Sequence, residues 1–184
     1  MTGLGFYPMV LSDYPFPKFQ AILKVQQIQF QDQGGNAMFK HIFVPTDGSE
    51  LSQEAARSAV DFAKATGARV TAFYAKPEYP YTYYGEGVMV DPTSPEHFAR
   101  MAEELAQQNL SFIDDLCQQA GVPCARKTLT SDIPYEAIIE AATESGCDLI
   151  YMASHGRRGI SALLLGSETQ KVLTHTQIPV LVYR

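Results

Sequence analysis

Two glycines and a serine near the end of the chain have the spacing of a loop that could bind phosphate. An apolar run ends at Ala153, Gly156 follows it, and Gly166 with Ser167 comes ten residues later. Glycine permits a positive φ and a close approach of backbone to ligand, so Gly156 is the best candidate for the turn that leaves the strand. Ser167 and Gln170 form the S-x-x-Q pattern of a capping box, which predicts that Ser167 caps a helix. Amides at such a helix start favour an anion.

The same residues also have a purely structural interpretation. Any unit of strand, loop and helix needs turn glycines and a capping residue, and glycine patterns this loose are frequent. Gly156, Gly166 and Ser167 therefore indicate phosphate binding only together with a second feature.

The segment Pro45-Thr46-Asp47-Gly48-Ser49 supplies such a feature. In an open parallel sheet, ligands bind beyond the carboxyl ends of the strands, where the strand order reverses. If the first and fourth strands are neighbours, Asp47 faces the Gly156 loop. Its carboxylate could then accept hydrogen bonds from ribose or adenine, or help to hold Mg²⁺. The alternative is a carboxylate that only caps the first helix.

Groups suited to catalysis are scarce in these segments. His155 has the chemistry of an acid, a base or a phosphoryl acceptor, but no second His or Cys lies close in sequence, so we interpret it as a hydrogen-bond donor. Arg157 and Arg158 are expected in solvent, with contact of one of them to a phosphate as the alternative. We assign no catalytic residue. The other histidines have no spacing that suggests a metal site: His41, His97 and His175.

A regular alternation of strands and helices must position these segments. Apolar runs predict strands at 41–46, 69–75, 124–129, 148–153 and 178–183. Helical periodicity and caps predict helices after Ser49, after Ser94, from about 134 to 145 and after Ser167. Five strands alternating with four helices predict an α/β fold, a single open parallel sheet with helices on both faces.

Two segments stand apart from this alternation. Residues 1–37 show little periodicity, and they are either an extension that packs on a partner or residues ahead of a natural start at Met38. The loop from 76 to 95 is rich in Tyr, Pro and Gly and is longer than a connection needs, which favours a lid or a partner surface. The helix after it is expected to pack on the core through one stripe: Phe98, Met101, Leu105, Phe112 and Leu116.

Composition excludes several classes of protein. A chain of 184 residues with 46% hydrophobic residues supports one core, and a net charge of -6 with a pI near 5.1 argues against nucleic acid as the main partner. The sequence contains no stretch of 18 apolar residues, so we expect no membrane span. The first residues do not have the pattern of a signal peptide. Three cysteines at spacings unlike zinc or disulfide motifs favour a reducing, cytoplasmic setting.

Residues 38–184 resemble the universal stress protein family. The resemblance is carried by HIFVPTDGSE, SDIPYEAIIEAA and MASHGRRGISALLLGSETQKVLTHTQIPVLVYR. The nucleotide-binding branch of that family is marked by G-x2-G-x9-G-[ST], which this chain satisfies at Gly156, Gly166 and Ser167. Ala153 replaces the first glycine, and its methyl group would crowd a nucleotide if the backbone there required a positive φ.

The resemblance implies a Rossmann-like sheet with strand order 3-2-1-4-5 and a homodimer formed through the C-terminal strand. It implies ATP as the ligand, with Mg²⁺ as an optional companion. Pro45, Thr46 and Asp47 would meet the adenosine, and Ala75 and Met152 would line the adenine pocket. The ribose and phosphates would be surrounded by Ser154, His155, Gly156, Gly166, Ser167 and Glu168.

The leading hypothesis is an ATP-binding universal stress protein, a regulatory module of the stress response whose regulatory partner the sequence does not identify. One alternative is a structural dimer that binds no nucleotide, for which Ala153 is the argument. The other is a slow ATP hydrolase or nucleotidyl-transfer enzyme. The sequence gives little support to the enzyme alternative, because it shows no Walker lysine, no paired carboxylates and no nucleophile with an adjacent base.

Overall fold

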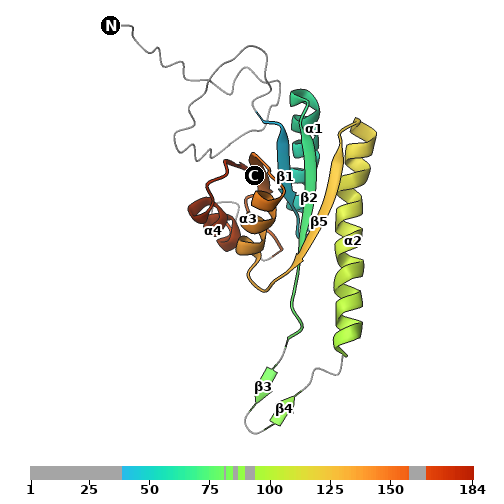
Figure 1. Ribbon diagram of the computed structural model, residues 1–184, viewed down its shortest axis with the longest axis vertical. Coiled ribbons are helices and arrows are strands. Elements are labelled where there is room, and N and C mark those ends of the chain that lie inside the picture. Colours follow the sequence, from blue (N-terminus) through green and yellow to red (C-terminus); the bar gives the residue numbers. More distant parts are fainter. Residues whose placement is uncertain (1–38, 81, 85–86, 90–93, 158–164) are drawn as a thin grey trace, which may run out of the picture.

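The computed structural model describes residues 39–80, 82–84, 87–89, 94–157 and 165–184. Its main sheet has five parallel strands in the order β5-β2-β1-β6-β7 (Figure 1). The strands are β1 (His41–Pro45), β2 (Arg69–Lys76), β5 (Cys124–Thr130), β6 (Leu149–Ala153) and β7 (Val180–Tyr183). Counted along the chain, these five strands have the order 3-2-1-4-5, so the predicted fold class and topology are confirmed.

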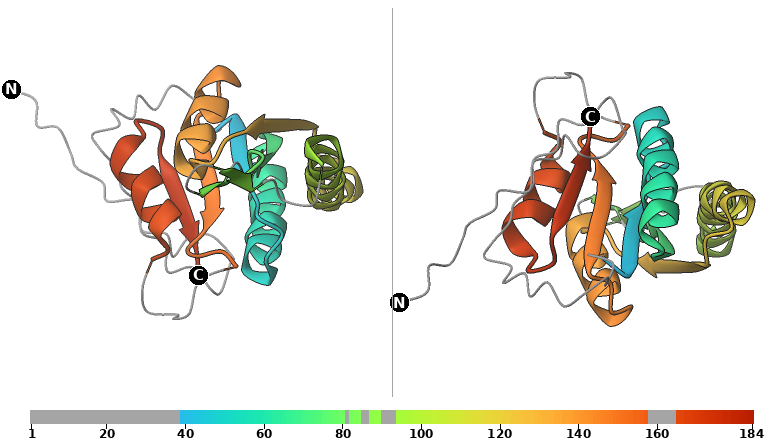
Figure 2. Two further views of the ribbon diagram at one scale, coloured as in Figure 1. Left: turned by 90° about the horizontal axis from the view of Figure 1, so that it is seen from below. Right: turned by 90° about the horizontal axis from the view of Figure 1, so that it is seen from above.

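Helices cover both faces of this sheet (Figure 2). On one face lie α1 (Glu50–Thr66) and α2 (Pro95–Ala120), and on the other lie α3 (Pro134–Glu144) and α4 (Ser167–His175). Because side chains alternate along a strand, each strand contributes to two cores. In β1, for example, Ile42 and Val44 join the core under α1 and α2, whereas Phe43 joins the core under α3 and α4.

Local capping chemistry sets the bounds of the two longer helices as predicted. Ser49 caps α1, its Oγ accepting from Ser52 N at 3.3 Å, and Ser94 caps α2 in the same way through His97 N. The next residue after each helix, Gly67 and Gly121, has φ of 70° and 71°, a left-handed conformation that glycine adopts without a Cβ penalty.

The predicted start of α4 is wrong by one residue. Gly166, with φ of -62°, occupies the N-cap position, and no side chain caps this helix. The amide of Gly166 donates to Ser154 O at 2.8 Å, and this tertiary bond fixes where the chain enters the helix. Gln170 does not complete a capping box, because its Nε2 donates to Leu165 O at 3.1 Å.

The predicted stripe of α2 is also partly wrong. Met101 is 53% exposed, and the buried line of the helix is Ala106, Leu110, Ile113 and Cys117. Figure 1 shows the reason, because the first half of α2 extends past the end of the sheet and only the second half covers it. Periodicity predicted the helix but not how much of it the sheet would reach.

The loop between β2 and α2 contains a short hairpin. Within the loop predicted at 76–95, β3 (Thr82–Tyr84) and β4 (Gly87–Met89) pair antiparallel as a separate two-stranded sheet. The hypotheses about residues 1–37 fall outside the described residues. Among the described residues, no helix has both the length and the apolarity to cross a bilayer.

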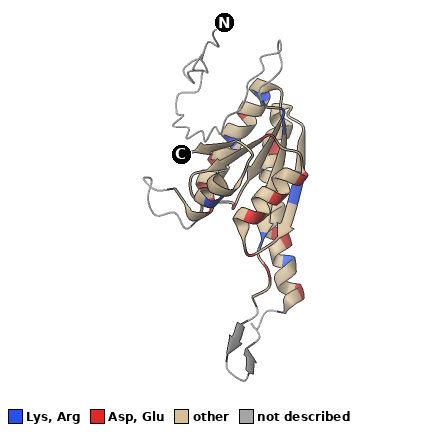
Figure 3. Ribbon diagram, turned by 60° about the vertical axis from the view of Figure 1, so that its left-hand side comes forward, with Lys and Arg blue, Asp and Glu red and all other residues tan. Residues whose placement is uncertain are grey.

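Charged residues do not form a basic stripe on the face shown in Figure 3, where Lys and Arg are scattered among Asp and Glu. Several of them pair across elements, as Lys76 does with Glu103 at 2.9 Å and Lys127 with Glu144 at 2.7 Å. This distribution agrees with the net charge of -6, and the absence of a nucleic-acid partner stays a prediction.

Candidate binding cleft

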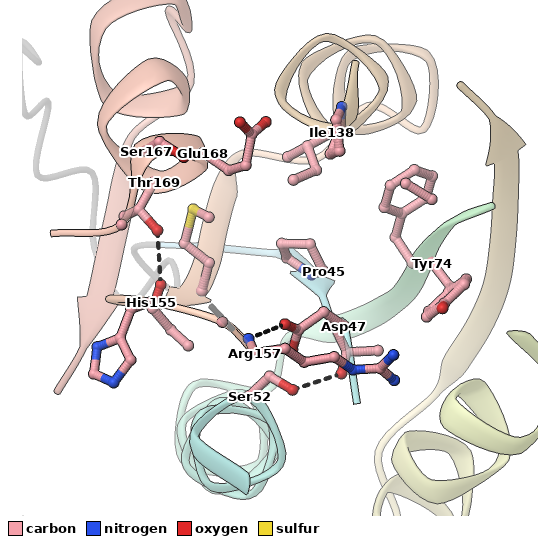
Figure 4. Close-up of a pocket in the computed structure, with 18 of the residues that line it drawn as sticks. Pro45, Asp47, Ser52, Tyr74, Ile138, His155, Arg157, Ser167, Glu168 and Thr169 are labelled. Atoms are coloured by element: carbon pink, nitrogen blue, oxygen red, sulfur yellow. Dashed lines mark hydrogen bonds between the residues drawn. The ribbon is translucent and has the colours of Figure 1, made fainter. Parts of the chain in front are cut away.

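A cleft of about 580 Å³ opens at the carboxyl ends of β1 and β6, the neighbouring strands from which the chain departs toward opposite edges of the sheet. This is the position at which an open parallel sheet binds ligands. Its volume lies within the range typical of small-molecule sites. Figure 4 shows side chains from both halves of the fold converging on it.

Asp47 ties the two halves of the cleft together. Its Oδ1 accepts from Ser49 N at 3.0 Å, and its Oδ2 accepts from the backbone amide of Arg157 at 2.8 Å. The carboxylate therefore braces the loop before α1 and also contacts the Gly156 loop. Ser49 and not Asp47 is the N-cap of α1, and a contact of Asp47 with a ligand stays a prediction. Burial by itself would raise the pKa of Asp47, but the hydrogen bonds from Ser49 and Arg157 outweigh it and the pKa lies below its ordinary value.

Gly156 is required for close approach and not for a left-handed turn. The described glycines with positive φ are Gly48, Gly67, Gly121 and Gly146, so the expected positive φ at Gly156 is wrong. A Cβ built on Gly156 would instead overlap Oδ2 of Asp47. Only a residue without a side chain lets the loop approach this carboxylate.

Ala153 does not need to be glycine. It is the last residue of β6, is paired with Tyr183 and is buried, so its backbone is extended, as any amino acid allows. Its carbonyl accepts from the Thr169 hydroxyl at 3.0 Å. The backbone argument against nucleotide binding at this position therefore falls away.

The start of α4 forms one wall of the cleft. Gly166, Ser167, Glu168 and Thr169 line it, and no side chain caps the helix. The first-turn amides of an uncapped helix lack partners inside the helix and attract anions. The Glu168 carboxylate is already engaged, with Tyr135 N at 3.0 Å and Lys171 Nζ at 2.9 Å.

His155 and Arg157 lie at the rim. Nδ1 of His155 is 3.1 Å from Ser154 Oγ, and in Figure 4 its ring points away from Asp47. This geometry does not form an acid-base pair with that carboxylate. The Arg157 side chain extends over Asp47 in Figure 4, and a Cβ on Gly48 would lie 3.0 Å from its guanidinium. Arg158 falls outside the described residues.

The structure gathers nearly all the predicted site residues at this cleft, and Ser154 is the exception. Ser154 is buried beneath the loop, where its carbonyl holds Gly166. The predicted residues that line the cleft are Pro45, Thr46, Asp47, Ala75, Met152, His155, Gly156, Gly166, Ser167 and Glu168.

Sequence reasoning missed several lining residues. Ser131 and Asp132 follow β5, and the rule that loops converge at the carboxyl ends of parallel strands would have found them. Ile138, Tyr74 and Thr169 carried no such signal, because their positions depend on how the helices and strands pack. Among the described residues, no three His, Cys, Asp or Glu side chains are grouped as a metal site.

The chain was compared with known proteins. A model described as the universal stress protein family matches residues 38–184. A universal stress protein of Methanocaldococcus jannaschii, MJ0531, is 32% identical over 152 residues, which cover 83% of this chain and 86% of the relative. A universal stress protein of Thermus aquaticus is 34% identical over 147 residues, covering 80% of this chain and all of the relative.

Solved structures share the fold. Universal stress protein UspA from Lactobacillus plantarum superposes with a TM-score of 0.65 at 23% identity and covers 81% of this chain and all of that one. A universal stress protein in complex with cAMP superposes with a TM-score of 0.58 at 24% identity, and the match covers 79% of this chain and 97% of that one. A family member from Arabidopsis thaliana with AMP bound superposes with a TM-score of 0.53 at 18% identity, and the match covers 78% of this chain and 90% of that one.

Proposed function

The chain belongs to the universal stress protein family, and we propose on that premise that it binds ATP in the cleft between β1 and β6. One observation carries the proposal. Asp47 holds the Gly156 loop beside the uncapped start of α4, so a carboxylate, a glycine loop and a helix N-terminus border one cavity. Family members solved with cAMP and with AMP have the same fold.

The apolar wall of the cleft suits a purine base. Pro45, Ala75, Ile138 and Met152 come from three strands and one helix and leave a surface with few charges. Aliphatic side chains bind the faces of an aromatic base by excluding water. Ser131 and Asp132 border the same space and offer acceptors to the amino group of adenine.

The opposite wall suits phosphates. The helix dipole and the unpaired amides at the start of α4 favour negative charge, each by roughly 0.3 to 1 kcal/mol when exposed. The guanidinium of Arg157 is a second source of positive charge at the rim. A nucleotide that brings Mg²⁺ would supply most of the metal ligands from its own phosphates, and Asp47 is one of the carboxylates of the cleft that could add a ligand.

We propose a binding module rather than an efficient enzyme. The described residues of the cleft include one histidine, and its ring is directed away from Asp47, the carboxylate that contacts the Gly156 loop. Slow hydrolysis by an ordered water is compatible with this arrangement. Turnover of ATP at about 1 per second or more, typical of working enzymes, would contradict the proposal.

The regulatory role and the assembly belong to the same proposal. We infer that nucleotide occupancy regulates a homodimer in the stress response, acting on a partner of unassigned identity. β7 is at the edge of the sheet, and an apolar edge strand is protected when it pairs with another copy. The described cysteines are free thiols, which supports the reducing cytoplasm as the site of action.

The proposal is tested by thermal unfolding of the full chain with and without ATP. A ligand that binds only the folded state stabilises it by about 2.7 kcal/mol at a concentration one hundred times its Kd. We expect ATP to raise the melting temperature of the wild type and of the control Asp61→Ala, whose carboxylate is exposed on α1. The shift should fall sharply in Asp47→Ala. Equal shifts in Asp47→Ala and the wild type would place the nucleotide elsewhere.

A further inference from the structure

Two of the three cysteines lie against each other at the junction of α2 and β5. Cys117 is in the last turn of α2, and Cys124 is the first residue of β5. The chain reverses between them through Gly121, with Val122 N donating to Cys117 O at 2.9 Å. Both side chains pack in the hydrophobic core beneath α1 and α2, where Cys117 is fully buried and Cys124 is partly exposed.

Cys124 also borders a second cavity, at the end of the sheet opposite the nucleotide cleft. This cavity has a volume of about 390 Å³ and lies at the amino ends of β2 and β5. Its walls include three basic residues, Arg69, Arg126 and Lys127. Cys124, which is partly exposed and lines this cavity, is therefore the member of the pair nearer to a small polar oxidant, whereas Cys117 is fully buried.

The two thiols differ in acidity. The hydrogen bond between them is the largest influence on both groups, and it raises the pKa of Cys117 and lowers the pKa of Cys124. Burial and the nearby carboxylate of Asp114 oppose this lowering of the Cys124 pKa, and Arg126, which pairs with Asp114, adds to the lowering more weakly. The thiolate is the nucleophile in cysteine chemistry, so Cys124 is the thiol that would be oxidised first.

We propose that Cys124 and Cys117 form an intramolecular disulfide when the protein meets a peroxide, linking the end of α2 to the start of β5. The Cys124 thiolate attacks one peroxide oxygen, the O–O bond breaks, and the leaving hydroxide takes a proton to become water. Cys117 then gives up its proton and attacks the Cys124 sulfenic sulfur, and a second water leaves. Two thiols lose two electrons in total, and the peroxide gains them.

Cys147 provides an internal control. It lies in the other core, under α3 and α4, and its burial raises the pKa of its thiol to about 11. A buried thiol of this kind reacts slowly, so Cys147 should stay reduced while the pair is oxidised.

The test oxidises the reduced full chain with hydrogen peroxide and maps its thiols by mass spectrometry after tryptic digestion. Both cysteines of the pair fall in one tryptic peptide, residues 101–126, because the next basic residue after Arg100 is Arg126. We expect that peptide to lose two hydrogen atoms in mass and to regain them with dithiothreitol. Cys147 should still react with iodoacetamide.

Variants separate the steps. Cys117→Ala should leave Cys124 as a sulfenic acid that dimedone traps, and Cys124→Ser should slow thiol loss roughly tenfold. Cys147→Ala should oxidise like the wild type, and circular dichroism checks that each variant is folded. The proposal is overturned if the 101–126 peptide keeps its mass after full oxidation, if the cysteines link only between chains, or if Cys147 is consumed as fast as Cys124.

Discussion

At the scale of single residues, the cleft depends on one carboxylate. Asp47 accepts hydrogen bonds from the backbone amides of Ser49 and Arg157, which lie on the two sides of the cleft. Arg157 is 110 residues from Asp47 in the sequence. Gly156 is the residue that allows the contact, since any side chain there would overlap the carboxylate. The two residues therefore act as a pair, and their substitutions should not be independent.

The pair predicts a non-additive double mutant. Gly156→Ala should weaken ATP binding about tenfold, equivalent to about 1.4 kcal/mol, because the new methyl group displaces Asp47. Asp47→Ala should weaken it by a similar factor, and the double variant should be no weaker than Asp47→Ala alone. Titration calorimetry measures the cycle. Additive losses would show that Gly156 acts independently of the carboxylate.

The lowered pKa of Asp47 predicts a dependence of stability on pH. Because its pKa is lower in the folded state, the stabilisation is complete above the ordinary value of 3.8 and is lost as the pH falls through the folded-state pKa. Asp47→Asn should lower the free energy of unfolding by about 1–2 kcal/mol at neutral pH. Urea denaturation of both proteins should show this difference shrinking in acid. A difference that persists when the carboxylate is protonated would refute the assignment.

At the scale of elements, the start of α4 is the phosphate-facing wall. ATP should bind more tightly than adenosine by roughly tenfold or more, because several amides and the helix dipole act on the phosphates together. High salt should reduce this preference, since salt screens exposed charges. Competition titrations at low and high salt measure both effects. Adenosine binding as tightly as ATP would mean that α4 does not face the phosphates.

The sequence predicted most elements but not their finer contacts. Periodicity and caps are local, so the five main strands, the four helices and the caps Ser49 and Ser94 are confirmed. The start of α4 was misplaced because a distant carbonyl, Ser154 O, holds Gly166. Met101 was wrongly placed in the core because the extent of the sheet beneath α2 is not a local property.

In the candidate site, too, the sequence predicted the general arrangement but not the contacts that depend on packing. Asp47 was predicted to face the Gly156 loop from the strand order that the family resemblance implies, and the structure brings them together. Of the two reasons given for Gly156, the positive φ was wrong and the close approach was right, but its close contact with the Asp47 carboxylate could not be read from spacing. Ile138 and Thr169 were missed, because they reach the cleft from the faces of helices and not from the ends of strands.

At the scale of the whole molecule, β7 predicts how two copies would pair. In a parallel strand, the N–H and C=O of one residue point toward the same neighbouring strand, and those of the next residue point the opposite way. The carbonyls of Pro179 and Tyr183 accept hydrogen bonds from amides of the β6 segment, so the backbone groups of Leu181 also point toward β6. The amide of Val182, one residue further along, therefore points outward from the edge of the sheet. A dimer formed through this edge would use the Val182 amide.

Val182→Pro should therefore dissociate the proposed homodimer while leaving the monomer folded, because it removes an outward donor and keeps the pairing with β6. Leu181→Pro is the matched control, since it removes a bond within the sheet and should destabilise the fold itself. Analytical ultracentrifugation and circular dichroism report the two outcomes. A dimer unaffected by Val182→Pro would exclude pairing through this edge.

Direct titration of the nucleotide-free full chain with ATP is the decisive measurement. The protein is unfolded, dialysed, refolded and titrated by calorimetry, with Asp47→Ala and Asp61→Ala in parallel. We predict saturable binding of one ATP per chain to the wild type and to Asp61→Ala, and at least about tenfold weaker binding to Asp47→Ala. A refolded wild type that binds neither ATP nor any other adenine nucleotide would contradict the proposed function.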